Sequence, residues 1–182
     1  MRRVLTGLLV SILLSCSPDE REIVVATSEI VGYDFGDGTN TIGSFRATYS
    51  QGITTVTIQL RDQTNGAIHS VHIYEGTCES PGDVWNLGTE DNYCQVSSLD
   101  QSWFKSKAGD IGNVLIGSDG TGSLQISTDL WSVGTGRNDD ILGKVVIVHF
   151  GPEDFLTECD PDHILDHTHP TTKMGCGEIS AL

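Results

Sequence analysis

The chain has 182 residues, which is enough for one domain with a sizeable apolar core. It carries 25 acidic against 10 basic residues, a formal charge of −15. This balance argues against a nucleic-acid partner and against a polybasic membrane-binding patch. Helical periodicity is nearly absent and 21 residues are glycine, so we expect short strands joined by turns.

The N-terminal segment is predicted to direct export. Arg2 and Arg3 precede an apolar run over residues 4–14, which is too short to span a bilayer and is typical of a signal peptide, assigned here to residues 1–15. Residues 13–16 (Leu-Leu-Ser-Cys) resemble a bacterial lipobox, which implies a diacylglycerol on Cys16. The alternative is an ordinary signal peptide with an incidental cysteine.

The next segment is expected to be a lipidated tether over residues 16–30, ahead of one folded domain at 31–182. It is acidic and shows no clear periodicity. Ser17 after the modified cysteine favours sorting to the outer membrane, so the predicted location is the bacterial cell envelope, facing the periplasm or at the outer membrane. Removal of Arg2 and Arg3 leaves eight basic against 25 acidic residues, a formal charge of −17.

The remaining chain is predicted to be all-β. Strict alternation over residues 55–60 places Val56, Ile58 and Leu60 on one face. Residues 112–117 and 122–127 are predicted to form a hairpin around a turn at 118–121. Other strands are expected at 45–49, 67–74, 144–150 and 177–182, with two long connections at 76–108 and 150–174. At least seven strands with such connections are typical of a Greek-key sandwich or flattened barrel.

Four cysteines remain after Cys16, and an even number in an exported chain predicts two disulfides. They are Cys78, Cys94, Cys159 and Cys176. Free buried thiols or a Cys-Cys metal site are the alternatives, but no Cys-x-x-Cys spacing supports a metal site.

Four blocks of the sequence resemble the Cu/Zn superoxide dismutase family in order and spacing. Residues 66–75 (Gly-Ala-Ile-His-Ser-Val-His-Ile-Tyr-Glu) resemble its metal-binding strand, and residues 109–114 (Gly-Asp-Ile-Gly-Asn-Val) resemble its zinc-aspartate segment. Residues 143–150 resemble the strand of its last copper histidine, followed by Glu153 and Asp154 where the family has an acidic pair. Residues 173–179 resemble its C-terminal block. The resemblance covers roughly residues 43–182 and implies a Greek-key β-barrel or sandwich with two long loops. It also implies a Cys78–Cys176 disulfide, which leaves Cys94 to pair with Cys159.

The resemblance implies a copper and zinc centre whose ligand set is incomplete here. His72 and His149 match copper ligands, but Tyr74 stands where the family has a histidine, and Val84 stands at the position of the bridging histidine. Lys107 replaces a zinc histidine, so only Asp110 remains of the zinc ligands and is expected to be structural. His69 matches a structural histidine of the family. We therefore regard zinc as unexpected at the family site and copper as the candidate metal.

Within the strand at 67–74, alternation places Val71 and Ile73 towards the core and His72 and Tyr74 on the outer face. His72 and His149, on neighbouring strands, could hold copper weakly, with Tyr74 as an axial or outer-sphere group. Alternatively, the two histidines hydrogen-bond to each other or to Tyr74.

Two further sets of residues are candidates for the site. His163, His167 and His169 lie within residues 160–170, where a folded-in loop could supply a missing ligand, although a solvent-exposed polar loop is the alternative. Lys173 stands where the family has an arginine that guides the anion, and it keeps the charge without the planar fork. Trp85 and Trp103 are expected to be packing anchors that replace the structural role of zinc.

Three functional hypotheses follow. The leading one is an exported, lipid-anchored member of this family with weak or no dismutase activity, which acts as a binding or surface module. The second is a copper-only superoxide dismutase, which converts superoxide to oxygen and hydrogen peroxide with His72, His149 and a loop histidine. The third is a periplasmic copper- or zinc-binding protein. The sequence does not define the oligomeric state.

Overall fold

The computed structural model describes residues 24–33, 40–87, 108–153 and 172–182, and all regular structure in these ranges is β. The strands are β1 Val24–Gly32, β2 Thr41–Ser50, β3 Ile53–Leu60, β4 Ile68–Tyr74, β5 Asp110–Leu115, β6 Gly122–Thr128, β7 Val145–His149, β8 Lys173–Glu178 and β9 Ser180–Ala181. No helix long and apolar enough to cross a membrane occurs in these ranges.

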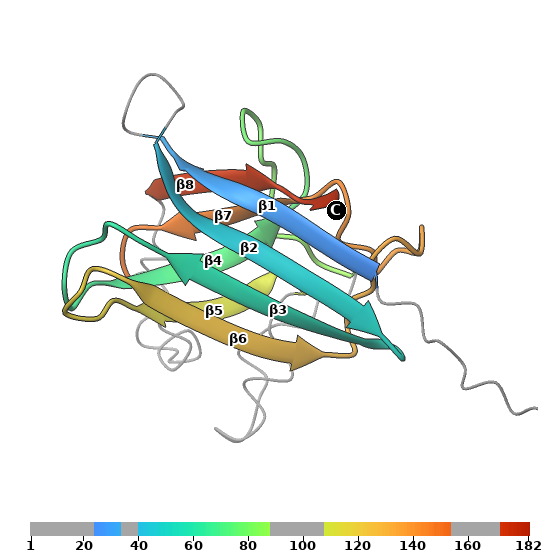
Figure 1. The fold of residues 1–182 in the computed structure, drawn as a ribbon. Coiled ribbons are helices and arrows are strands. Elements are labelled where there is room, and N and C mark those ends of the chain that lie inside the picture. The colour runs from blue at the N-terminus through green and yellow to red at the C-terminus, as the bar shows by residue number, and fades with distance from the viewer. Residues whose placement is uncertain (1–23, 34–39, 88–107, 154–171) are drawn as a thin grey trace, which may run out of the picture.

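The strands form one antiparallel sheet that curls into a nearly closed barrel. Its order is β5-β4-β7-β8-β1-β2-β3-β6, with β9 added to β1. Figure 1 shows β1, β2, β3 and β6 as one layer and β4, β5, β7 and β8 as the layer behind it. The connections from β3 to β4 and from β6 to β7 cross between the layers. This is the Greek-key β-barrel predicted from the sequence.

The core lies between the layers because each strand turns alternate side chains inward. In β3, Val56, Ile58 and Leu60 are buried, as the alternation predicts, and in β4 Val71 and Ile73 are fully buried. Beyond the strands, the core includes two tryptophans. Trp85 packs against Trp131 with ring centroids 6.5 Å apart, and the indole N–H of Trp131 donates to the carbonyl of Ala108 at 2.7 Å. The predicted packing role of Trp85 is confirmed.

Two predictions about the strands are wrong. The barrel begins at Val24, because β1 pairs with β2 from Val24 onwards, so residues 24–30 belong to the domain and not to a tether. Polar residues on the outward face of β1 hid its alternation. The turn between β5 and β6 exists, with Gly117 N–H donating to the carbonyl of Thr121 at 2.8 Å. Instead of pairing with each other, however, β5 pairs with β4 and β6 pairs with β3.

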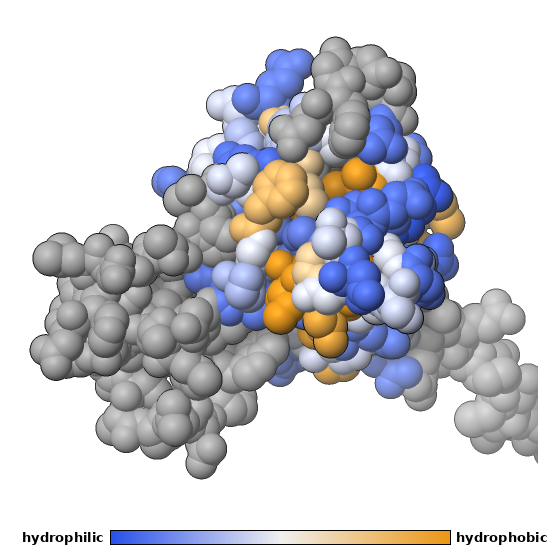
Figure 2. All heavy atoms as spheres, turned by 90° about the vertical axis from the view of Figure 1, so that its left-hand side faces the viewer, coloured by the Kyte–Doolittle hydropathy of each residue, from blue (hydrophilic) through white to orange (hydrophobic). Residues whose placement is uncertain are grey.

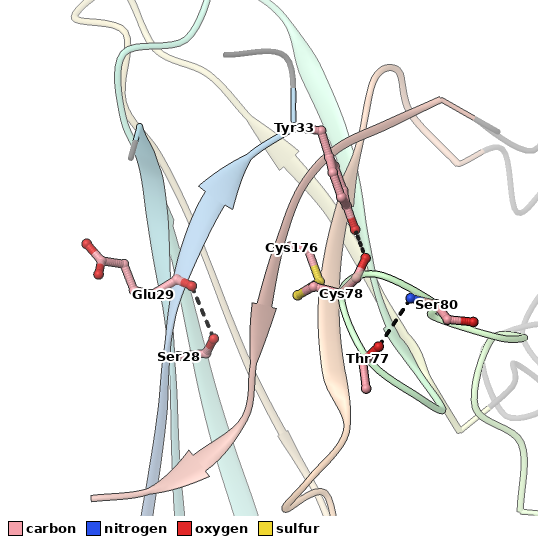
Figure 3. The surroundings of a disulfide bond; sticks show 7 residues. All are labelled: Ser28, Glu29, Tyr33, Thr77, Cys78, Ser80 and Cys176. Carbon is pink, nitrogen blue, oxygen red and sulfur yellow. Dashed lines mark hydrogen bonds between the residues drawn. A yellow bond between two sulfur atoms is a disulfide. The ribbon is translucent and has the colours of Figure 1, made fainter. Parts of the chain in front are cut away.

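The structure forms the Cys78–Cys176 disulfide that the family resemblance implies. It joins the connection after β4 to β8 across 98 residues (Figure 3). Figure 3 also shows the hydroxyl of Tyr33 donating to the carbonyl of Cys78, at 2.9 Å, so the end of β1 holds the same connection. Nearby, the backbone N–H of Ser80 donates to the hydroxyl of Thr77 at 3.2 Å. The start of this long connection is thus fixed to the barrel at several points.

Candidate functional site

The structure brings His72 and His149 together on the outer face of the β4–β7 pair. Their rings lie edge to face with centroids 5.2 Å apart, and only 5% and 2% of the two residues is exposed. His72 is paired with Ile147 on β7, and His149 is paired with Lys173 on β8. Because alternate residues of β4 share a face, Tyr74 lies on the same side as His72. We call His72, Tyr74 and His149 the ring cluster.

Two carboxylates approach one nitrogen of His72. Its Nε2 lies 3.5 Å from Oε2 of Glu153 and 3.7 Å from Oδ1 of Asp110, and all three side chains are nearly buried. Both carboxylates are acceptors, so they favour a proton on Nε2. Asp110, expected only to be structural, thus orients a histidine of the ring cluster.

Glu153 is the site residue whose role was missed in the sequence. Two hydrogen bonds join the backbone of Glu153 to the side-chain amide of Asn113. The N–H of Glu153 donates to Oδ1 of Asn113 at 2.9 Å, and Nδ2 of Asn113 donates to the carbonyl of Glu153 at 2.8 Å. The side-chain amide thereby replaces a strand partner and fixes the segment against β5. The signal available was the Glu153-Asp154 pair just after the last strand histidine.

Tyr74 is the third member of the ring cluster, at the position where the sequence resemblance implies a copper histidine. Its hydroxyl lies 3.2 Å from Nε2 of His149. Burial raises the pKa of Tyr74 to about 12, and the negative charges of Glu153 and Asp110 act in the same direction. The phenol is therefore protonated at neutral pH, and its hydroxyl shares a hydrogen bond with Nε2 of His149. This is the alternative in which Tyr74 hydrogen-bonds a histidine, and it removes from metal binding the nitrogen that faces the cluster.

Lys173 lies beside the ring cluster rather than in open solvent. Its Nζ is 5.3 Å from the centroid of the Tyr74 ring, within the range of a cation–π interaction. Its predicted role as an anion guide remains a prediction.

The raised pKa of Tyr74 predicts how stability changes in alkali. The folded-state pKa, about 12, lies above the ordinary value of 10.0, so the unfolded chain loses this proton first. The contribution of Tyr74 to stability is complete below pH 10 and is lost as the pH rises through 12. We expect Tyr74→Phe to show a smaller alkaline loss, measured as the free energy of unfolding against pH. Equal losses in the parent and the variant would contradict this assignment.

Both strand pairs that carry the histidines contain a β-bulge next to the site. In the β4–β5 pair the register shifts between Val71 and His72, so His72 faces Asp110 and Ile111 is left over. In the β7–β8 pair it shifts between Val148 and His149. Gly112, at the first bulge, has a φ of 133°, a conformation that L side chains rarely adopt. The bulges place Asp110 and Lys173 on the face of the histidines.

The donor set does not fit the metal centre that the sequence resemblance implies. Val84 forms an isolated antiparallel bridge with Tyr74, so an apolar side chain lies where a bridging histidine is expected. Among the described residues, no group of three or more His, Cys, Asp or Glu is arranged to hold a metal ion. Two imidazoles and a protonated phenol lack the closed shell of a tight copper or zinc site.

His69 lies apart from the ring cluster. Its Nδ1–H donates to the carbonyl of His149 at 3.0 Å, which is a structural contact that supports the end of β7. Several predicted residues fall outside the part of the chain that the structure describes: His163, His167, His169, Cys94, Cys159, Cys16, Trp103 and Lys107.

The structure is thus a Greek-key β-barrel with two nearly buried histidines beside two carboxylates on its outer face. The family model described as copper/zinc superoxide dismutase matches residues 39–179, and the chain belongs to that family. Among curated proteins, no relative matches the sequence.

Solved structures of a superoxide dismutase-like protein from Bacillus subtilis share the fold. That protein has a TM-score of 0.63 at 21% identity, over 86% of this chain and 97% of that one. A double variant of it, in which a tyrosine and a proline are each replaced by histidine, has a TM-score of 0.62 at 22% identity, over 86% of this chain and 95% of that one.

Proposed function

We propose that this chain is an exported, lipid-anchored member of the Cu/Zn superoxide dismutase family that has lost dismutase turnover and acts as a binding or surface module. The observation that carries the loss of turnover is the hydroxyl of Tyr74 at 3.2 Å from Nε2 of His149. In the metal-free protein this phenol, with a pKa of about 12, is neutral at neutral pH, and its hydroxyl occupies the approach to that nitrogen.

A weak copper site remains the second candidate, favoured by the close approach of His72 and His149. Their ring centroids are 5.2 Å apart in a nearly buried patch, so a third nitrogen from residues 160–170 could complete a copper-only site. The same two histidines would serve a copper- or zinc-binding protein without turnover. Metal stoichiometry and a superoxide assay separate these functions.

The test is to load the purified chain with copper and to measure affinity, stoichiometry and superoxide dismutation. We expect loose binding, no turnover, and the same behaviour in His72→Ala and the parent. Binding of one tight equivalent with turnover that is lost in His149→Ala would overturn the proposal. In that case single alanine variants at His163, His167 and His169 identify the added ligand.

Lipid anchoring has its own test. The Cys78–Cys176 disulfide supports an oxidising compartment outside the cytoplasm, where such bonds persist. Expressed in a bacterium, the chain should appear in the membrane fraction, cleaved before Cys16 and carrying diacylglycerol by mass spectrometry. Cys16→Ser should abolish the modification and release the protein from the membrane fraction. A cleaved, unmodified Cys16 in the soluble periplasmic fraction would show that the cysteine is incidental.

A further inference from the structure

The sheet has two free edges, because the barrel is not fully closed. Its strand order ends in β5 on one side and in β6 on the other. Among the described residues, β5 pairs only with β4, and β6 pairs only with β3. Figure 1 shows β6 as the lowest strand of the front layer, with β5 in the layer behind it. A free edge presents unpaired N–H and C=O groups, which can pair with a strand of another chain.

The two edges differ in how they are protected against such pairing. β5 contains the charged Asp110 and the β-bulge at Gly112, and charges and bulges are features by which edge strands avoid other chains. In contrast, β6 has no charged residue, no proline and no register shift against β3. β6 is therefore the unprotected edge of the sheet.

One side-chain hydrogen bond shows which backbone groups of β6 are free. The hydroxyl of Ser123 donates to the carbonyl of Ile58 at 3.1 Å, so this carbonyl points from β3 towards β6. Leu124 is the register partner of Ile58, so its backbone groups point back towards β3. Alternation then turns the N–H and C=O groups of Ser123, Gln125 and Ser127 to the free edge. The side chains of these three residues are exposed.

The sequence of this edge reads nearly the same in both directions, as Ser123-Leu-Gln-Ile-Ser127. An antiparallel contact between two copies about a two-fold axis at Gln125 places Ser123 opposite the partner's Ser127. Leu124 then lies opposite the partner's Ile126, and the two Gln125 residues lie opposite each other. Hydroxyl meets hydroxyl, amide meets amide and apolar meets apolar, and each pair that faces the edge exchanges two N–H···O bonds.

The same axis brings two exposed leucines together at each end of the contact. Leu115 is 64% exposed and Leu130 is 52% exposed. Leu115 lies beside the start of β6, since a Cβ on Gly122 would come within 2.7 Å of its carbonyl oxygen, and Leu130 follows the end of β6. Figure 2 views the end of the barrel where β5 ends and β6 begins, and it shows apolar side chains exposed among hydrophilic ones. Because the start of one β6 meets the end of the other, Leu115 comes beside the partner's Leu130.

We propose that β6 pairs with β6 of a second copy of this chain, so that the front layers of two barrels form one continuous antiparallel sheet. The dimer is closed, because each copy uses its β6 once and its other edge is protected. The ring cluster lies on the other layer and takes no part in the contact. This interface goes beyond the binding role proposed above and does not rest on copper or on the loss of turnover.

The test measures the self-association of the full chain by sedimentation equilibrium. The chain carries Cys16→Ser, so that a lipid cannot drive association. We expect a monomer–dimer equilibrium without larger species. Added salt should tighten the dimer, because it screens the repulsion between chains of charge −15 and between Asp119 and Asp129 at the ends of β6. Gln125→Lys should weaken the dimer about fivefold or more, since it sets two like charges directly opposite each other.

Gln59→Lys is the matched control, because Gln59 is an exposed glutamine on the inner strand β3 of the same layer. It makes the same change of charge away from the edge, and its dimer should be as stable as that of the parent. Unchanged melting temperatures show that the variants are folded.

Cysteine pairs test the register. Opposite residues that exchange backbone bonds have Cα atoms about 5.5 Å apart, which is within the range of a disulfide. A mixture of Ser123→Cys and Ser127→Cys should therefore form a mixed disulfide-linked dimer on mild oxidation, and neither variant should do so alone. A monomeric parent, an unchanged dimer in Gln125→Lys, equal weakening in Gln59→Lys, or no mixed cross-link would each overturn the proposal. Copper affinity and the superoxide assay are independent of these results, so a failure here is distinct from a failure of the proposed loss of turnover.

Discussion

The double variant Tyr74→His with Val84→His is expected to bind copper at least roughly 100-fold more tightly than the parent, since even the indirect partners of a metal ligand are worth about 10–100-fold. Tyr74 and Val84 face each other across an antiparallel bridge, so both new imidazoles project from the face that holds His72 and His149. The change also removes the phenol that engages Nε2 of His149. Copper affinity and superoxide dismutation measured on the purified variant check this expectation.

The control for this variant is Tyr74→Phe with Val84→Ala, which removes the same native side chains without adding nitrogen. It should bind copper no better than the parent. If the histidine variant keeps its melting temperature and still gains no affinity for copper, the four imidazoles do not converge on one point. In that case the geometry described above for the ring cluster is wrong.

Removal of the disulfide by Cys78→Ala with Cys176→Ala should lower the melting temperature by roughly 10–20 °C. The bond closes a loop across 98 residues, for which chain entropy gives roughly 4–5 kcal/mol. Cys176 is also buried, in a small cluster with Val145 and Ile147 next to Tyr74. We expect the loss to extend to the ring cluster, because the disulfide holds the connection that carries Val84.

Differential scanning calorimetry measures the change, and peptide mapping under non-reducing conditions identifies the bond. An unchanged melting temperature would mean that the barrel does not depend on the disulfide. A map in which Cys78 is joined to Cys94 would invalidate the alignment of the whole metal region with the family.

The fold could be predicted because local and global signals agree. Alternation in β3 and β4 defined buried faces, and four separate blocks matched one family in order. The prediction failed at β1, where Thr27 and Glu29 lie among acidic neighbours and composition resembled a tether. It also failed for the β5–β6 pair, since a short turn between two strands usually joins partners in one ladder, whereas here each strand finds its partner elsewhere.

The positions of the two site histidines could be predicted from the sequence, whereas those of the two carboxylates could not. The two-residue period of β4 places His72 and Tyr74 together, and the strand match adds His149. In β5, strict alternation from exposed Leu115 would place the side chain of Asp110 towards the core. The β-bulge at Gly112 shifts the alternation by one residue and places Asp110 on the outer face. The contact of Glu153 with His72 depends on the Asn113 amide, a long-range hydrogen bond that no local pattern encodes.

The bulges beside His72 and His149 separate two kinds of evolutionary change. A side chain on the outer face, such as that of Tyr74, can be exchanged by one substitution with little disturbance of the interior. Loss of a bulge would instead remove a buried residue, Ile111 or Met174, from the core. The stability of the barrel therefore depends on the backbone of the site, whichever side chains that backbone carries. Point mutations on the outer face can thus change the chemistry of the site while the shape of its backbone is retained.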